Sequence, residues 1–302
     1  MATKNLKHLL PLKGVRVLSL ALNLPGPAAL MRCQQMGATC VKLAPPAPAG
    51  APPGASGDPM SWYNIEAYAA LHQGIRLAVA DLKTEKGQQA LHRELAKTDV
   101  LLTSFRPSAL KKLGLEWKLL NKLYPALSLI AIVGAPGDRA EEPGHDLTYL
   151  AEYDLVNGLE LPPTLYADMG GSLMASEAVL KAVLAQKLQG KGHYQEVALS
   201  SAAAYLALPR TWGLTQPGAA VGGGHAGYRV YACKNGRVAL AALEPHFAKS
   251  LCAAAGIADA SINSMMSAAT QAQIAAFLVS KTRQALDKLS IEQDIPLFTL
   301  PK

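Results

Sequence analysis

The chain has 302 residues, half of them hydrophobic, and carries a formal net charge of +7. This length and apolar content predict a globular protein with one large domain or two modest ones. The basic balance would suit a polyanion, but the basic residues are scattered, aromatic residues make up only 6%, and no nucleic-acid motif is present. We therefore expect no nucleic-acid partner, because a small phosphorylated ligand explains the charge equally well.

Neither a membrane span nor a secretion signal is evident. The apolar runs of the first twenty residues are broken by Lys7, Lys13 and Arg16. Nowhere does the chain contain the roughly 18 uninterrupted apolar residues that a spanning helix needs. The four cysteines form no C-x-x-C pair and no ligand spacing with the seven histidines, which argues against a zinc site and a disulfide framework. We expect a cytoplasmic protein with no metal site and no membrane partner.

Short apolar runs alternate with helical stretches in the first half of the chain. Val15–Leu22 predicts a strand that ends at Pro25-Gly26-Pro27, and a helix follows over Ala28–Met36. The later elements repeat this order, with strands at Cys40–Leu43, Val100–Thr103 and Leu127–Val133 and helices at Lys86–Lys97 and Glu116–Leu123. The pattern is typical of an α/β fold, a parallel sheet with helices on both faces that binds ligands beyond the carboxyl ends of its strands. The fingerprint G-x-G-x-x-G is absent from the first turn, so we do not expect NAD.

Long helices are predicted in the middle of the chain. The Pro/Ala/Gly-rich residues 44–61 predict a surface loop. Ser172–Leu188 predicts an amphipathic helix, and Val197–Leu208 a more apolar one that suits either the core or a subunit contact. The core is the simpler interpretation of this second helix.

A different pattern follows Gly222. Tyr228–Cys233 and Arg237–Leu243 flank Asn235-Gly236, which predicts a β-hairpin, and helices are expected over Pro245–Ala255 and Thr270–Leu289. A short apolar run ends the chain. The predicted division is a large Rossmann-like domain over residues 1–220, a small α+β domain over residues 221–290 and a short C-terminal return segment over residues 291–302.

Two glycine-containing phrases carry an imidazole and a carboxylate that could share one site. Gly144-His145-Asp146 and Tyr166-Ala167-Asp168-Met169-Gly170-Gly171 are both predicted to be loops that precede helices. His145 and Asp168 could each hold or release a proton near neutral pH, and the glycines would let backbone N–H groups approach a ligand. Simpler explanations exist: Asp168 suits a helix cap, and His145 suits a hydrogen-bonded structural group.

Three basic residues and one acid complete the set of candidates. Arg76, Arg106 and Lys112 fall in or after turns at the edges of the predicted sheet layer, where a polyphosphate could lie. A solvated surface charge is the alternative, and it is stronger for Lys112 than for Arg106, which follows a strand at the expected ligand-binding edge. Glu244 precedes Pro245 and could be merely a capping-region acid.

A series of short phrases occurs in order along the chain. They are Pro11–Leu18 (PLKGVRVL), Pro25-Gly26-Pro27, Met36-Gly37-Ala38 with Val41-Lys42, Ala80-Asp81-Leu82-Lys83, Phe105-Arg106-Pro107, Leu113-Gly114-Leu115, Gly144-His145-Asp146, Ala167–Gly171, Gly190-Lys191-Gly192 and Leu243-Glu244-Pro245. In this order they resemble the family III CoA-transferases, and within them the α-methylacyl-CoA racemase branch. The resemblance runs from about Pro11 to the C-terminus.

This resemblance implies a site and a reaction. Asp168 would be catalytic with His145 as its partner, and Glu244 would support the histidine, as in racemases. The implied reaction is a two-base 1,1-proton transfer on a 2-methylacyl-CoA thioester, in which one group removes the α-proton and the other returns a proton to the opposite face. No cofactor is implied beyond the CoA of the thioester. The residues expected to contact the acyl-CoA are Gly74, Arg76, Arg106, Lys112, Gly144, Asp146, Tyr149, Gly170 and Gly171.

The resemblance also implies an interlocked homodimer, with each active site between the large domain of one chain and the small domain of the other. Two other activities stay open. Asp168 could be the nucleophile of a CoA-transferase that takes the acyl group from the thioester. An inactive CoA-binding relative is also open, because the usual acid after the second strand is replaced by Ala44-Pro45-Pro46, and residues 133–138, 154–164 and the C-terminus are reduced.

Overall fold

A computed structural model describes residues 9–302. Residues 1–8 belong to the segment for which we expected no signal peptide, and they lie outside the described residues. The chain forms two compact units, the first ending at Ala207 and the second beginning at Leu208. This division comes earlier than the predicted boundary at residue 220. The short helix η2 (Ala220–Gly222) contacts a strand of the second unit, so the segment before residue 220 continues into that unit.

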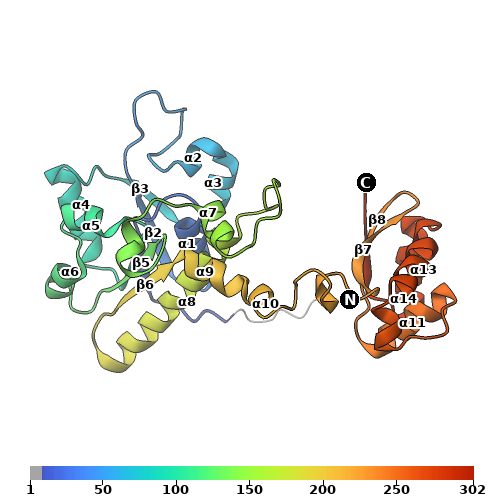
Figure 1. The fold of residues 1–302 in the computed structure, drawn as a ribbon. Coiled ribbons are helices and arrows are strands. Elements are labelled where there is room, and N and C mark those ends of the chain that lie inside the picture. The colour runs from blue at the N-terminus through green and yellow to red at the C-terminus, as the bar shows by residue number, and fades with distance from the viewer. Residues whose placement is uncertain (1–8) are drawn as a thin grey trace. The chain divides into compact units, whose positions relative to one another are not determined.

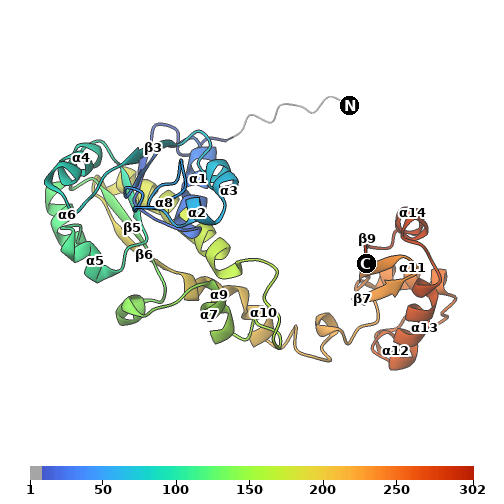
Figure 2. The ribbon, with the colours of Figure 1, turned by 90° about the horizontal axis from the view of Figure 1, so that it is seen from above.

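The first unit contains the predicted parallel sheet, which Figures 1 and 2 show with helices on both sides. All neighbouring strands are parallel, in the order β3-β2-β1-β4-β5-β6. The strands are β1 (Arg16–Ser19), β2 (Thr39–Ala44), β3 (Arg76–Val79), β4 (Val100–Thr103), β5 (Ser128–Val133) and β6 (Tyr194–Ala198). The α/β fold class is therefore confirmed.

Alternating side chains of the strands supply two cores, one on each face of the sheet. Val17 packs in the core that includes residues of α1 and α8, whereas its neighbour Leu18 packs in the core that includes residues of α4, α5 and α6. This alternation is what a strand buried on both faces requires. The helices of the first unit are α1 (Pro25–Gln35), α2 (Met60–Tyr63), α3 (Ile65–Leu71), α4 (Glu85–Leu95), α5 (Pro107–Lys112), α6 (Trp117–Leu123), η1 (Gly137–Glu141), α7 (Asp146–Glu152), α8 (Tyr166–Gln189) and α9 (Leu199–Leu206).

Three predictions for the first unit were wrong in detail. Strands β3 and β6 were missed, and the helix expected from Val197 begins only at Leu199, because Val197 and Ala198 pair with β5 as the end of β6. The helix expected from Ser172 begins at Tyr166, so Gly170 and Gly171 lie inside α8 and not in a loop. The predicted surface loop over residues 44–61 is exposed at its centre, but its Asp58 is fully buried.

The second unit is a small α+β layer that confirms the hairpin. Strand β7 (Tyr228–Cys233) pairs antiparallel with β8 (Gly236–Ala241), and β9 (Leu297–Leu300) pairs with the other edge of β8. Residues 291–302 therefore do not form a separate return segment, because β9 completes this sheet. The helices of the unit are α10 (Leu208–Thr211), α11 (Pro245–Ala255), α12 (Ile262–Met265), α13 (Ala268–Val279) and α14 (Arg283–Gln293).

The helix predicted over Thr270–Leu289 is two helices. α13 ends at Val279, and the side chain of Thr282 accepts a hydrogen bond from the Ala285 N–H to cap α14. In the part of the chain that the structure describes, no helix has the length and apolar character to cross a bilayer. All four cysteines are buried free thiols.

Candidate active site

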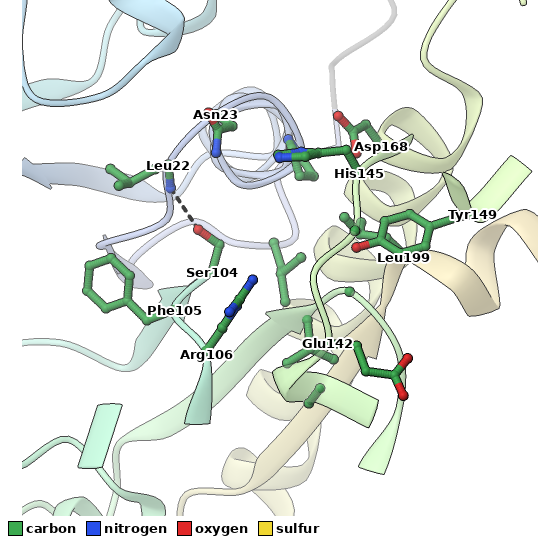
Figure 3. Close-up of a pocket in the computed structure, with 16 residues that line it drawn as sticks. Leu22, Asn23, Ser104, Phe105, Arg106, Glu142, His145, Tyr149, Asp168 and Leu199 are labelled. Atoms are coloured by element: carbon green, nitrogen blue, oxygen red, sulfur yellow. Dashed lines mark hydrogen bonds between the residues drawn. The ribbon is translucent and has the colours of Figure 1, made fainter. Parts of the chain in front are cut away.

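A cavity of about 240 Å³ lies beyond the carboxyl ends of β1, β4 and β5, the edge at which parallel sheets bind ligands. Five of the predicted site residues line it together: Arg106, Gly144, His145, Tyr149 and Asp168. Figure 3 shows the His145 ring and the Asp168 carboxylate at one end of the cavity and the Arg106 guanidinium extending toward its centre. The cavity is smaller than the roughly 300–1,000 Å³ of pockets that bury drug-sized ligands.

His145 precedes α7 and is fixed through its backbone. Its N–H donates to Thr148 Oγ1 at 3.1 Å, and the Thr148 hydroxyl donates back to the His145 carbonyl at 2.8 Å. His145 is exposed, and it lines the cavity. The ring is therefore available to a ligand while its Cα is held in place.

Asp168 lies in the first turn of α8, and the carboxylate of Asp146 holds it there. Asp146 is buried, and its Oδ1 accepts a hydrogen bond from the Asp168 N–H at 2.9 Å. This bond joins the N-terminal ends of α7 and α8, so it sets the positions of both His145 and Asp168. The hydrogen bond between the N-terminal ends of the two helices offsets part of the cost of burying the Asp146 carboxylate.

Asp168 has a strongly altered acidity. Burial, and secondly the negative charge of Asp146, raise the pKa of the Asp168 carboxyl from 3.8 to about 7. Such a group holds its proton in part of the molecules at neutral pH and releases it in the rest. A carboxyl of this kind can act as an acid or as a base at pH 7.

Tyr149 forms the wall next to Asp168, and two glycines make room for it. A Cβ at Gly134 would lie 2.4 Å from the Tyr149 Oη, and a Cβ at Gly144 would lie 2.6 Å from its Cε1. Burial, and secondly the charge of Asp168, raise the pKa of the Tyr149 hydroxyl, with Arg106 opposing them. Gly144 therefore serves the packing of Tyr149.

Gly170 and Gly171 have a different role from the one predicted. Because they lie inside α8, their N–H groups belong to the helix and are not exposed on a loop. A Cβ at Gly171 would lie 2.3 Å from Leu199 Cδ2, and a Cβ at Gly170 would lie 3.2 Å from Leu206 Cδ1. The two glycines allow α8 and α9 to approach each other closely.

Four other predicted residues lie away from the cavity lining. Arg76 is the first residue of β3, at the amino end of the sheet, and it forms an ion pair with Glu94 at 2.7 Å. Gly74 is in the turn before β3, with φ +76°. Lys112 is the exposed last residue of α5. Glu244 is exposed at the N-cap of α11 in the second unit, so its support of His145 stays an expectation of the resemblance.

Residues that sequence reasoning missed complete the lining. Ser104 and Phe105 follow β4, Glu142 follows η1, and Asn23 lies in the turn before α1. Asn23 has a left-handed backbone, with φ +62°. The available signal was an Asn at the end of the first strand, because Asn tolerates this conformation better than most residues.

A second cavity, of about 250 Å³, lies nearby at the carboxyl ends of β2 and β3. Phe105 lines both cavities, so the two adjoin at this side chain. The second cavity is mainly apolar, with Lys83 and Asp81 in its lining. Its lining residues are Leu43, Pro45, Ala80, Asp81, Leu82, Lys83, Phe105, Ala109 and Leu113. Within residues 9–302, no group of three His, Cys, Asp or Glu side chains could hold a metal ion.

The chain was compared with protein families and curated proteins. The family model described as CoA-transferase family III matches residues 12–300. A cinnamoyl-CoA:phenyllactate CoA-transferase of Clostridium sporogenes is 30% identical over 64% of this chain and 50% of its own length. The α-methylacyl-CoA racemase of Homo sapiens is 28% identical over 85% of this chain and 68% of its own length. The chain thus spans only about half the length of some curated relatives.

The fold also matches solved structures. A crystal structure of a hypothetical protein from Mycobacterium tuberculosis superimposes with a TM-score of 0.80 at 23% identity. The match covers 97% of this chain and 86% of the other. At this identity, the likeness concerns the fold.

Proposed function

Because this chain belongs to CoA-transferase family III, we propose that its cavity acts on acyl-CoA thioesters, and that the reaction is the racemisation of a 2-methylacyl-CoA by two-base proton transfer. The observation that carries the proposal is the pairing of His145 with Asp168 in one cavity, where the pKa of the Asp168 carboxyl is raised to about 7. An imidazole and a carboxyl can each act as the acid or as the base of a proton transfer. Two groups of matched basicity are what a reversible proton transfer needs.

The proposed reaction proceeds in two steps. One group, His145 or Asp168 according to the enantiomer, takes the α-proton, and the C–H electron pair moves into the enolate of the thioester. The other group, protonated at the start, then gives its proton to the opposite face of the α-carbon. The thioester is unchanged, and the configuration of the α-carbon is inverted.

The CoA part of the substrate is proposed to leave the catalytic cavity past Phe105 and Arg106. Phe105 borders the second, mainly apolar cavity, in which Lys83 offers a cation. The exposed Arg106 follows Phe105 at the N-cap of α5 and lines the first cavity, where it can pair with a phosphate. Arg76, at the amino end of β3, is less suited to this role.

A CoA-transferase is the second candidate. Several relatives are named as transferases, including the one from Clostridium sporogenes. In that reaction the Asp168 carboxylate would attack the thioester carbonyl, form an acyl-aspartyl anhydride and release CoA as the thiolate. The raised pKa of Asp168 disfavours this role, because a protonated carboxyl is a poor nucleophile. An interlocked homodimer remains part of the proposal on the strength of the resemblance.

Deuterium incorporation at the α-carbon of 2-methylbutanoyl-CoA in D₂O tests the proposal. We expect the wild type to exchange this proton, and His145→Ala and Asp168→Asn each to reduce the exchange at least hundredfold, the lower range for general acid–base groups. Glu66→Gln, which removes an exposed carboxylate on α3, is the matched control and should exchange at the wild-type rate.

The other outcomes identify the alternatives. Exchange that survives both substitutions contradicts the two-base reaction. An acyl-aspartate that hydroxylamine traps on Asp168, without exchange, identifies a transferase. Thermal stabilisation by CoA with neither activity identifies an inactive CoA-binding relative.

A further inference from the structure

Asn23 places a carboxamide at the cavity from a left-handed backbone position. It lies in the turn between β1 and α1, lines the cavity and has φ +62°. Its side chain makes no hydrogen bond to any of residues 9–302, and Figure 3 shows it near the end of the cavity that His145 occupies. An amide that lines a polar cavity without a protein partner can bond to a ligand, both as donor and as acceptor.

The backbone of this turn is held from two sides. The Asn23 N–H donates to Asp58 Oδ1 at 2.9 Å, and the preceding Leu22 N–H donates to Ser104 Oγ at 2.9 Å. Asp58 Oδ1 also accepts from the Met60 N–H at 3.1 Å. The Asn23 side chain therefore starts from a fixed point at the cavity wall.

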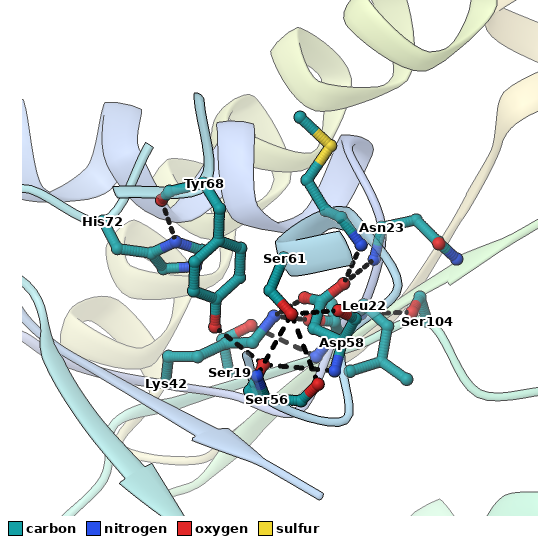
Figure 4. Close-up of polar contacts among 12 residues, drawn as sticks. Ser19, Leu22, Asn23, Lys42, Ser56, Asp58, Ser61, Tyr68, His72 and Ser104 are labelled. Carbon is teal, nitrogen blue, oxygen red and sulfur yellow. Dashed lines mark hydrogen bonds and ion pairs between the residues drawn. The ribbon is translucent and has the colours of Figure 1, made fainter. Parts of the chain in front are cut away.

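Asp58 is itself anchored by a buried ion pair, which Figure 4 shows. Its Oδ2 lies 2.6 Å from the Lys42 Nζ, and both side chains are fully buried. Lys42 also donates to the Ala21 carbonyl, two residues beyond the end of β1. Ion pairs of this kind gain little net stability, and one reason to keep them is a fixed geometry. Here the fixed element is the turn that carries Asn23.

The cavity limits what the carboxamide can bind. Its volume of about 240 Å³ suits a short acyl group. A plain hydrocarbon chain would leave the Asn23 amide desolvated and unpaired, which is unfavourable. An acyl group with an oxygen at the right place would satisfy the amide instead.

We propose that Asn23 is a specificity-determining residue that selects short acyl-CoA thioesters whose acyl group carries a hydrogen-bonding oxygen, and that Asp58, which accepts the Asn23 N–H, positions it. This inference rests on the proposed function, because it assumes that the cavity binds acyl-CoA thioesters. The preference in Kd can be measured whether or not the protein turns the thioester over.

The test compares two thioesters of similar size, 2-methyl-4-oxopentanoyl-CoA and 2,4-dimethylpentanoyl-CoA, which differ by a ketone oxygen in place of a methyl group. Calorimetry gives Kd for each, and deuterium exchange gives kcat/KM. We expect the wild type to favour the ketone by about ten- to hundredfold, the range for one hydrogen bond to a group otherwise left unpaired.

Substitutions at Asn23 test the carboxamide. Asn23→Gly keeps the left-handed backbone without the amide, and Asn23→Asp keeps the shape but loses the N–H donors. Both variants should bring the ketone preference to about one while the constants for the dimethyl thioester change little. A preference that survives in both variants overturns the assignment of Asn23.

Two double variants test the positioning role. Lys42→Met with Asp58→Asn removes both charges but keeps an oxygen that can accept the Asn23 N–H, whereas Lys42→Met with Asp58→Ala removes that acceptor. We expect the first to retain most of the ketone preference and the second to lose it, with folding checked by circular dichroism. Equal preferences in two folded double variants contradict the positioning role.

The failures of the two proposals are distinguishable. A wild type that exchanges deuterium equally well in both thioesters and binds them with equal Kd supports the proposed reaction and overturns this inference. A wild type that exchanges neither but binds the ketone more tightly, through Asn23, overturns the racemase and supports the inference.

Discussion

The chemistry of Asp168 depends on a residue 22 positions earlier in the chain. Asp146 contributes a hydrogen bond to the Asp168 backbone and a negative charge beside its carboxyl. The folded protein keeps the Asp168 proton up to about pH 7, whereas the unfolded chain releases it near 3.8. The contribution of this group to folding stability therefore falls as the pH rises through that window.

Asp146→Asn separates the charge from the hydrogen bond. The Asn Oδ1 can still accept from the Asp168 N–H, but the neighbouring negative charge is gone, so the pKa of Asp168 should fall. In the proposed reaction, for the substrate enantiomer whose proton Asp168 would remove, the rate of deuterium exchange should rise with pH around a midpoint near 7 in the wild type. The variant should shift this midpoint to lower pH. An unchanged midpoint would show that Asp146 affects Asp168 only through the hydrogen bond to its backbone and not through its charge. Glu66→Gln is the control and should leave the midpoint unchanged.

At the scale of elements, the site is built where two pairs of elements meet. α7 and α8 begin side by side at the carboxyl edge of the sheet, and α8 packs against α9 through its glycines. Leu199, at the start of α9, lines the cavity and occupies the space that Gly171 leaves open. The close approach of these helices thus shapes the cavity as well as the core.

Gly171→Ala and Gly170→Ala form a matched pair that measures this packing. In both variants, replacing glycine with alanine inside a helix favours folding by about 1 kcal/mol. The new Cβ at residue 171 would overlap the buried Leu199, whereas at residue 170 the neighbours need to move only slightly. We expect Gly171→Ala to be less stable than Gly170→Ala by about 1–3 kcal/mol. Urea unfolding followed by circular dichroism measures the difference, and equal stabilities would contradict it.

At the scale of the molecule, each unit has its own sheet and its own core. The core of the second unit includes Leu240 of β8, Leu251 of α11 and Leu278 of α13, and β9 pairs along β8. Units with separate cores generally fold on their own. Within the part of the chain that the structure describes, the lining of the cavity that contains Asp168 comes entirely from the first unit.

Two fragments of the second unit test its independence. Residues 208–302 expressed alone should unfold in one cooperative thermal transition. A fragment of residues 208–296 lacks β9 and leaves β8 at the sheet edge, so it should melt at a lower temperature. A non-cooperative melt of the longer fragment, or equal melting of the two, would contradict the architecture of this unit.

Local patterns predicted most of the elements. The strand at Val100–Thr103, the helix at Pro245–Ala255 and the Asn-Gly hairpin have the expected type and place. The exceptions were segments whose partners are distant. β3 is a four-residue strand at the sheet edge, and its Leu77 and Val79 are exposed. The glycines of α8 suggest a loop until the packing of α9 is known.

The difference between local patterns and contacts of distant segments also applies to the site. By itself the sequence determined the alternating α/β order and the family, and it pointed to His145 and Asp168 as candidates, because periodicity and short phrases are encoded in neighbouring residues. Only the tertiary structure decided that Asp146 holds Asp168, that Arg76 lies at the other end of the sheet from Arg106, and that the Lys42–Asp58 pair anchors Asn23. The hydrogen bonds and the ion pair among them join residues 16 to 35 positions apart, and they exist only once the sheet and its helices have packed.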